Sequence, residues 1–131
     1  MEILIRRHNR QKGGNRAAYA DLERAGAMFV YCGRPGPLGN PFRVGRNYSK
    51  QRAVDDYRLL LGEDYAKHFP ADKVEYVRTR ALERIQQIAK KVRRNPTAHR
   101  IVLLCPCYVE GEPCHAEVIR EKLLEVLEVA K

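Results

Sequence analysis

The chain has 131 residues, of which 44% are hydrophobic and 31% are charged, with a formal net charge of +9. This length is typical of one domain, and the hydrophobic fraction is too high for a disordered chain. No stretch approaches the roughly 18–20 apolar residues of a membrane span, and the short apolar run near the start does not fit a secretory signal. We therefore expect a single soluble, cytoplasmic domain over residues 1–131, with no membrane partner.

The first third of the chain predicts two strands. Residues 1–5 are typical of a short strand, and the basic stretch 8–16, which has no apolar side chain, predicts a loop. Residues 17–25 contain helix formers but have only a weak apolar face. Residues 27–32 form a continuous apolar run that ends at Gly33, as expected for a buried strand.

The middle of the chain predicts two helices. Ser49 is a good N-cap for a first helix that ends at Gly62. Asp72 is the N-cap candidate of a longer helix, which ends before Pro96 in a run of cations that the helix dipole favours. The apolar residues of this longer helix recur every three or four positions: Val74, Val77, Ala81, Ile85, Ile88 and Val92.

The last third predicts a second buried strand at residues 101–105 and a final helix at residues 115–130. Alternating strands and helices indicate an α/β fold, a small Rossmann-like three-layer sandwich with a mainly parallel sheet. In such sheets the ligand crevice lies outside the carboxyl ends of the strands. Two unusual segments follow those ends here, residues 33–47 and 105–115.

The positive charge is concentrated near the start of the chain. Residues 1–52 have a net charge of +8, residues 53–100 of +4 and residues 101–131 of −3. Such a distribution attracts phosphate groups of a nucleotide or nucleic acid, although a basic protein without such a partner has the same charge. The candidate nucleic-acid-binding residues are Arg6, Arg7, Arg10, Lys12 and Arg16.

The first unusual segment is a loop rich in glycine and proline. Its glycines permit positive φ and close approach of backbone N–H groups to an anion, and an arginine supplies charge. The amide of an asparagine in the loop is suited to contact a base or ribose edge. We therefore predict a phosphate- or nucleotide-binding loop formed by Gly33, Arg34, Gly36, Gly39 and Asn40. The alternative is a turn that only changes the chain direction, because the glycine spacing is neither dinucleotide-binding nor Walker-type.

The second unusual segment contains three of the four cysteines. Cys105, Cys107, Cys114 and His115 offer three thiolates and an imidazole, the kind of ligands that zinc binds tetrahedrally. Cys32, at the end of the other buried strand, is an alternative fourth ligand. An iron–sulfur cluster and, in a hyperthermophile, a disulfide are further alternatives.

The same segment also admits a site without metal. Cys114 and His115 precede the last helix, whose N-terminus favours anions and lowers the pKa of a thiol. Either Cys114 is then a reactive thiolate or His115 contacts a phosphate, and these two residues are the candidate catalytic groups. Alternatively, Cys105 and Cys107 are small buried hydrophobic residues.

Together the two segments resemble domain-of-unknown-function family 4326, which has a Gly-Arg-Pro…Gly-Asn-Pro-Phe element and a Cys-x-Cys…Pro-Cys-His element. The matching residues are Gly33, Arg34, Pro35, Gly39, Asn40, Pro41 and Phe42, then Cys105, Cys107, Pro113, Cys114 and His115. The resemblance covers about residues 28–125, so residues 27–131 are the family-like core and residues 1–26 a basic N-terminal extension. It implies a Rossmann-like fold with one shared site and no particular activity.

Two functional hypotheses follow. In the first, a crevice between residues 33–42 and residues 105–115 binds a nucleotide or nucleic-acid phosphate; this hypothesis includes both a binding protein and an enzyme acting on a nucleotide or nucleic-acid base. In the second, the protein is a non-enzymatic module that a bound metal stabilises. The basic N-terminal half of this module binds the nucleic-acid backbone.

Overall fold

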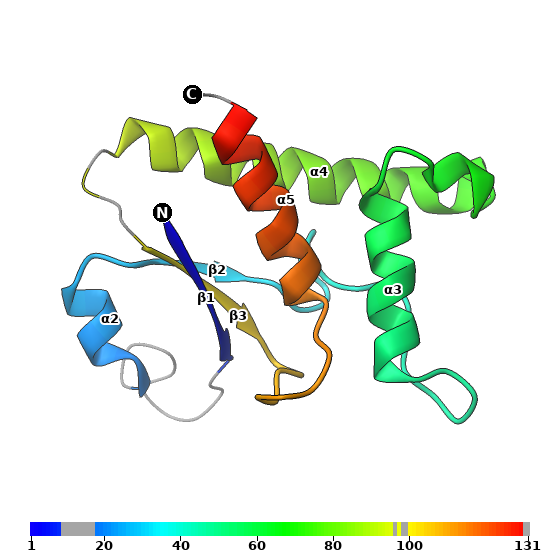
Figure 1. The fold of residues 1–131 in the computed structure, drawn as a ribbon, viewed down its shortest axis with the longest axis horizontal. Coiled ribbons are helices and arrows are strands. Elements are labelled where there is room, and N and C mark those ends of the chain that lie inside the picture. The colour runs from blue at the N-terminus through cyan, green and yellow to red at the C-terminus, as the bar shows by residue number, and fades with distance from the viewer. Residues whose placement is uncertain (9–17, 96, 98–99, 130–131) are drawn as a thin grey trace.

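A computed structural model describes residues 1–8, 18–95, 97 and 100–129 of the chain (Figure 1). Its sheet has three strands in the order β1-β3-β2, where β1 is Glu2–Arg7, β2 is Met28–Tyr31 and β3 is Arg100–Cys105. Both outer strands pair with β3 in parallel. The α/β fold with a parallel sheet is therefore confirmed.

The central strand β3 explains the apolar run at its position in the sequence. Its last five residues, 101–105, are all buried, because β3 has a neighbour on each edge and is covered by the rest of the domain. The outer strand β1 alternates instead, with Ile3 and Ile5 buried between more exposed residues. In the register of the sheet, Ile101 lies beside both Ile3 and Met28.

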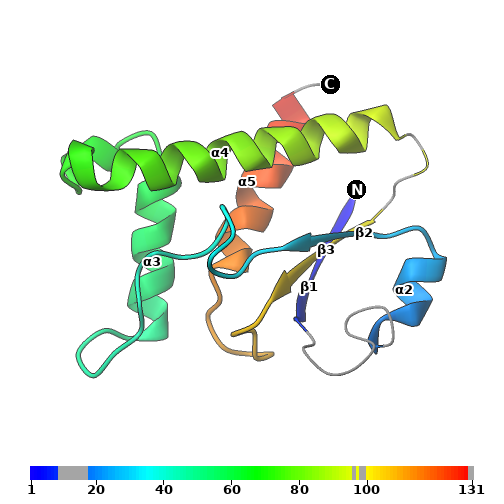
Figure 2. The same cartoon turned by 180° about the vertical axis from the view of Figure 1, so that it is seen from behind.

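The helices lie on both sides of the sheet. The short helix α2, Ala20–Arg24, lies on one side, and the long helices α4, Ala71–Arg94, and α5, Ala116–Val129, lie together on the other (Figures 1 and 2). The helix expected over residues 17–25 is thus shorter than predicted. The physical reason is that α2 buries none of its residues, and the chain turns away at Gly26, which has a φ of 81°.

Helix α3, Lys50–Leu61, begins and ends as the sequence predicts. The Ser49 hydroxyl oxygen accepts a hydrogen bond from the Arg52 N–H at 3.1 Å, and Gly62 is the C-cap. Its buried face is formed by Ala53, Val54, Tyr57, Leu60 and Leu61. A single 3-10 turn, η1, Tyr65–Lys67, connects α3 to α4.

The prediction that Asp72 caps the long helix is wrong. Helix α4 already begins at Ala71, after Pro70, whose extended backbone (φ −62°, ψ 124°) leads directly into the first turn. The helix ends at Arg94, before Asn95, as the cation run predicts. Its buried residues include Ala81, Ile85 and Ile88, all from the predicted apolar face.

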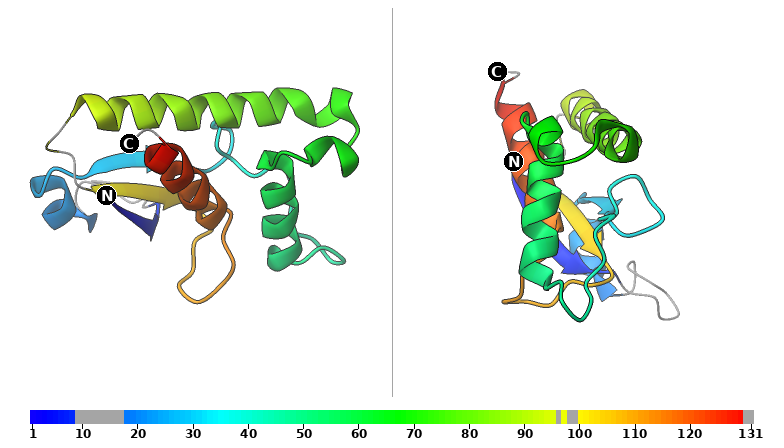
Figure 3. Two further views of the ribbon diagram at one scale, coloured as in Figure 1. Left: turned by 45° about the horizontal axis from the view of Figure 1, so that its top comes forward. Right: turned by 90° about the vertical axis from the view of Figure 1, so that its right-hand side faces the viewer.

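Helix α5 joins the layers of the domain. It contacts β1 and β3 of the sheet and also packs against α3 and α4, and Figure 3 shows it lying across the strands. Its first turn follows the loop that leaves the carboxyl end of β3. Within the described part of the chain, no helix combines the length and the apolar character needed to cross a bilayer.

Candidate functional site

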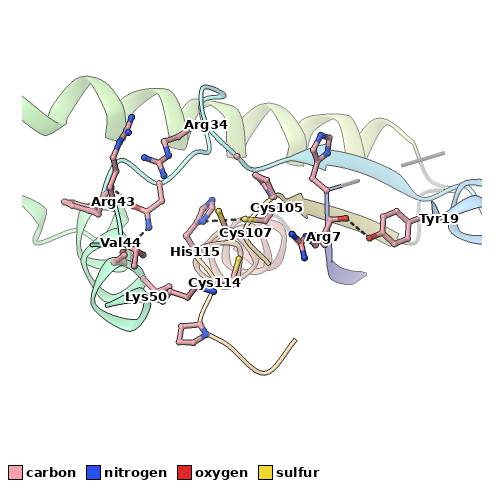
Figure 4. A pocket seen from close by; sticks show the side chains of 18 residues that line it. Arg7, Tyr19, Arg34, Arg43, Val44, Lys50, Cys105, Cys107, Cys114 and His115 are labelled. Carbon is pink, nitrogen blue, oxygen red and sulfur yellow. Dashed lines mark hydrogen bonds between the residues drawn. The ribbon is translucent and has the colours of Figure 1, made fainter. Parts of the chain in front are cut away.

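A cavity of about 1180 Å³ lies at the carboxyl ends of the strands, between the two segments that the sequence singled out (Figure 4). Its walls come from β1, residues 33–47 (the Gly/Pro loop), α3 and the loop that follows β3. The lining residues are Arg7, His8, Tyr19, Gly33, Arg34, Asn40, Phe42, Arg43, Val44, Lys50, Ala53, Val54, Cys105, Pro106, Cys107, Pro113, Cys114 and His115. The position matches the crevice predicted for an open parallel sheet.

Three of the predicted metal ligands meet on one wall of this cavity. Cys105 is the last residue of β3, and Cys114 and His115 immediately precede α5. One ligand atom of each residue lies within 4.8 Å of the others. Cys105 and Cys114 are buried and His115 is partly buried. We call these three residues the Cys/His cluster.

The His115 ring is held in one orientation by backbone and aromatic contacts. Its Nε2 lies 2.5 Å from the carbonyl oxygen of Cys32, at the end of β2, and donates a hydrogen bond to it. The imidazole makes a T-shaped contact with the ring of Tyr57 on α3, with the ring centroids 5.4 Å apart. A neutral imidazole that donates from Nε2 has its lone pair on Nδ1, which lies 3.9 Å from Cys105 Sγ. The ring therefore presents its acceptor nitrogen to the thiols.

The two thiols of the cluster shift each other's pKa in opposite directions. The hydrogen bond from the Cys105 thiol lowers the pKa of Cys114 below its ordinary value, and the Ala116 N–H acts in the same direction. The pKa of Cys105 is raised, first by that hydrogen bond and then by burial. The lowered pKa of Cys114 suits either a metal ligand or a nucleophile.

The other two cysteines stand apart from the cluster. Cys107 lines the cavity, but its side chain is exposed and outside the group of three. Cys32 is fully buried, its Sγ lies 3.6 Å from the carbonyl oxygen of Val30, and burial raises its pKa. Of the two, only Cys107 faces the cavity.

The rest of the cavity wall is cationic. Arg34, Arg43 and Lys50 lie on one side of the cluster and Arg7 on the other (Figure 4). Lys50 pairs with Glu112 at 3.3 Å, and within the described ranges none of the three arginines has an ion-pair partner. Among the described residues no carboxylate lines the cavity. The wall therefore suits an anionic ligand.

The glycines of the Gly/Pro loop serve packing rather than unusual backbone angles. In the described segments positive φ occurs only at Gly26 and Gly111, so the glycines at 33, 36 and 39 do not use the positive φ that glycine permits. A Cβ at Gly33 would lie 2.6 Å from Tyr31 Cζ, and one at Gly39 would lie 2.9 Å from the backbone of Arg34. Close packing of the loop on itself and on Tyr31 therefore requires glycine at these positions.

The backbone amides of this loop are largely committed to internal turns. The Gly36 N–H donates to the Gly33 carbonyl and the Gly39 N–H to the Gly36 carbonyl, each at 3.0 Å. Neither Gly36 nor Gly39 lines the cavity. The loop instead reaches the cavity through Gly33, Arg34 and Asn40, together with Phe42 and residues 43–44. Its charge comes from arginine side chains, and its shape comes from the turns.

Asn40 fastens the Gly/Pro loop to α3. Its Nδ2 donates to the Ala53 carbonyl at 3.1 Å, and its Oδ1 accepts from the Phe42 N–H at 2.9 Å. Asn40 is 8% exposed. The side chain that the sequence suggested for a base or ribose contact is therefore engaged within the protein on both its oxygen and its nitrogen.

The predicted basic contacts of the N-terminal half separate in the structure. Arg7 lines the cavity, whereas the neighbouring Arg6 bonds through its guanidinium to the Ile5 carbonyl at 2.9 Å. Arg10, Lys12 and Arg16 lie outside the described residues. Strand alternation explains the difference between Arg6 and Arg7, because successive side chains point to opposite faces.

Several residues of the site have no distinctive motif in the sequence. Tyr57 is one of the apolar-face residues of α3, yet its hydroxyl donates to the Leu38 carbonyl at 2.9 Å while its ring contacts His115. Lys50 is an ordinary residue in the first turn of α3. The polar hydroxyl on the apolar face of α3 is the one feature that points to Tyr57, because buried tyrosines need a hydrogen-bond partner.

The fold and the site together define an α/β domain with an open parallel sheet and a Cys/His cluster in a cationic cavity. The sequence profile of DUF4326, a domain of unknown function, matches residues 16–125. The chain belongs to this family, as the two motifs indicate. The match begins at residue 16, earlier than the motifs alone suggested. Neither the curated proteins nor the solved structures give a match to this chain.

Proposed function

We propose that the cavity binds a phosphate-bearing ligand of nucleotide size. The observation that carries this proposal is the composition of its wall: four cations, Arg7, Arg34, Arg43 and Lys50, and among the described residues no carboxylate. Arginine side chains without an ion-pair partner keep their donors available for phosphate oxygens, which they bind in pairs. The volume of about 1180 Å³ leaves room for a base and sugar as well as phosphates.

The cavity also has an apolar side on which a flat ring can lie. Phe42, Val44 and Val54 line it from the Gly/Pro loop and α3, next to the arginines. Phe42 is itself supported by Phe69, with ring centroids 5.4 Å apart. A ligand with a base at one end and phosphates at the other uses both kinds of surface.

The Cys/His cluster gives this binding site groups that can react with a bound ligand. Cys114 and His115 are the candidate catalytic groups, either directly, with Cys114 as thiolate, or as ligands of zinc. In either form the ligand is a substrate, and the protein is an enzyme acting on a nucleotide or nucleic-acid base. The cavity is then an active site rather than a site for binding alone.

Calorimetric titration with ADP, pyrophosphate and adenosine tests the proposal. We expect ADP and pyrophosphate to bind and adenosine to bind at least about 10-fold more weakly, because hydrogen bonds to charged groups each contribute roughly 1.5–3 kcal/mol. Arg34→Ala should weaken ADP binding by about 10-fold or more for the same reason. Equal affinity of adenosine and ADP would overturn the proposal.

Arg80→Ala is the matched control. Arg80 lies on α4 outside the cavity, with its guanidinium 5.5 Å from the centre of the Tyr76 ring. The substitution removes the same charge, so a general effect of net charge would weaken ADP binding equally in both variants. We expect Arg80→Ala to bind ADP as the parent protein does.

The second hypothesis, binding of a nucleic-acid backbone, predicts a different salt dependence. A protein that neutralises many phosphates loses affinity steeply and linearly with the logarithm of salt concentration. For a compact cavity that holds two or three phosphates, affinity falls only slightly as the logarithm of salt concentration rises. Titration of a single-stranded oligonucleotide at several salt concentrations separates the two: tight binding with a steep slope that survives Arg34→Ala would favour the module.

A further inference from the structure

We infer that the Cys/His cluster binds one Zn²⁺ through the two sulfurs and His115 Nδ1, and that the fourth coordination position opens into the cationic cavity. This centre is the kind found in catalytic zinc sites, where three protein ligands leave one position for water or substrate. The inference rests on the proposed function in one respect only: the cavity is the route by which a ligand reaches the ion.

The three donors are already close to the separation that zinc requires. Bonds of about 2.3 Å to sulfur and 2.0 Å to nitrogen place tetrahedral donors about 3.5–3.8 Å apart. Cys105 Sγ and His115 Nδ1 are 3.9 Å apart, and all three donor atoms lie within 4.8 Å of one another. A small movement of side chains therefore brings them around one ion.

The imidazole is held as a ligating histidine usually is. Metal-binding histidines donate their second ring N–H to a carbonyl or carboxylate, which fixes the ring and leaves the other nitrogen free to bind. The Cys32 carbonyl has this role toward Nε2 of His115, at 2.5 Å. The Tyr57 ring, in T-shaped contact with the imidazole, limits its rotation from another side. The free nitrogen, Nδ1, faces the sulfurs.

The chemistry of the donors also favours zinc. Zn²⁺ binds cysteine thiolates and histidine nitrogen, and the cluster supplies two sulfurs and one imidazole with their ligand atoms within 4.8 Å of one another. Bound as thiolates, the two sulfurs balance the double positive charge of the ion.

Neither of the remaining cysteines occupies the fourth coordination position. The Cys32 sulfur is fully buried beside the Val30 carbonyl, and its backbone carbonyl already serves His115. Cys107 is exposed at the cavity wall and outside the group of three. Because all three cluster residues line the cavity, the side of the ion away from them faces the cavity. Water, or an anionic group drawn in by the arginines, takes the fourth position there.

Substitution of Co²⁺ for Zn²⁺ makes the centre visible. The metal-free protein is titrated with Co²⁺, and the thiolate-to-cobalt charge-transfer band and the visible d–d bands are recorded. We expect one Co²⁺ per chain, displaced by one Zn²⁺. We then expect the d–d bands to shift when cyanide or imidazole is added, because a small ligand replaces water at the fourth position.

Cys107→Ser and Cys114→Ser form a matched pair that identifies the ligands. Cys114→Ser should weaken metal binding by more than about 100-fold. Loss of a group that only hydrogen-bonds to a metal ligand costs up to about 100-fold, and loss of the ligand itself should cost more. Cys107→Ser should bind within about twofold of the parent protein and keep the response to cyanide. If Cys114→Ser does not fold, His115→Gln provides the same test.

Three results would overturn the inference. The first is that the parent protein does not bind one equivalent of Co²⁺ or Zn²⁺. The second is that Cys107→Ser weakens binding as much as Cys114→Ser, which would make Cys107 a fourth ligand of a closed structural site. The third is a cobalt spectrum that neither cyanide nor imidazole changes.

The metal experiment and the ADP titration fail independently. Cobalt binding with a response to cyanide, in a protein that shows no preference for ADP over adenosine, would retain the open metal centre and reject the phosphate-binding cavity. A preference for ADP in a protein that binds no metal would retain the phosphate-binding cavity and reject the metal centre. Cys114 would then be a free thiolate.

Discussion

The buried hydroxyl of Tyr57 donates a hydrogen bond to the backbone carbonyl of Leu38 at 2.9 Å. Both residues are 0% exposed, and the two are 19 positions apart in the chain. The same tyrosine ring contacts His115. One side chain on α3 thus supports the Gly/Pro loop and the Cys/His cluster, which form opposite walls of the cavity.

Tyr57→Phe should lower the free energy of unfolding by about 1–3 kcal/mol, because the Leu38 carbonyl is left buried without its partner. Urea denaturation followed by circular dichroism measures the change. Tyr76→Phe is the control: Tyr76 is 70% exposed, so its hydroxyl remains in water and stability should not change. Equal effects of the two substitutions would contradict the structural role of the Tyr57 hydroxyl.

Asn40→Ala should destabilise the domain by roughly 2–3 kcal/mol, because it removes the bonds to the Ala53 carbonyl and the Phe42 N–H. Asn47→Ala, at an exposed position of the same segment, should change stability by less than about 0.5 kcal/mol. Thermal denaturation compares the two. If Asn40 contacts a base instead, Asn40→Ala will keep full stability and lose discrimination between ADP and pyrophosphate.

Gly33→Ala should destabilise the domain and disturb the cavity wall. The added methyl group would lie 2.6 Å from Tyr31 Cζ and 2.7 Å from Pro106 Cδ, and both neighbours would have to move. Overpacking of this kind typically costs about 1–3 kcal/mol. Gly45→Ala is the control, because a Cβ there has no neighbour within 4 Å and its φ is not positive. Unfolding in urea should show a loss for Gly33→Ala alone.

The ion pair between Arg58 and Glu121 joins α3 to α5 through two hydrogen bonds, of 2.9 and 3.1 Å. The hydrogen bond to Glu121 raises the pKa of Arg58. Because the side chains are 43% and 53% exposed, solvent screens the pair. A double-mutant cycle with alanine at both positions should give a coupling free energy of about 0.2–1 kcal/mol.

The measured coupling should fall further when salt concentration is raised. A coupling above about 2 kcal/mol, unchanged by salt, would instead show that this ion pair makes a major contribution to holding α5 in place. Helix α5 directly follows Cys114 and His115. The effect on Co²⁺ binding should be small in both single variants, since neither residue lines the cavity.

Most elements of the fold follow from local patterns in the sequence. The run at residues 101–105 predicts β3, and the cap at Ser49 predicts the start of α3, because both depend on neighbours within a few positions. Helix α4 begins before the expected N-cap, Asp72. Pro70 is the N-cap instead, because its backbone angles lead directly into the first turn. Helix α2 is short because no apolar face fixes its ends.

The sequence by itself also determined that the two motifs meet. They follow two strands of one parallel sheet, and the carboxyl ends of such strands lie at the same edge, so topology alone brings Cys105 near the Gly/Pro loop. Which cysteines gather was decided only by the tertiary structure. Cys107 is two residues from Cys105 yet outside the cluster, whereas Cys114 is nine residues away and inside it. Side-chain direction after a strand ends depends on the turn, which spacing does not encode.

The tautomer of His115 and the role of Tyr57 likewise exist only in the folded protein. The imidazole donates to a carbonyl at position 32, and the tyrosine bonds to a carbonyl at position 38, so each contact spans distant parts of the chain. Local sequence determines strands, helices and caps because those interactions act over a few residues. The site is decided by tertiary structure because its hydrogen bonds are made to backbone atoms, which every residue type shares and no sequence pattern marks.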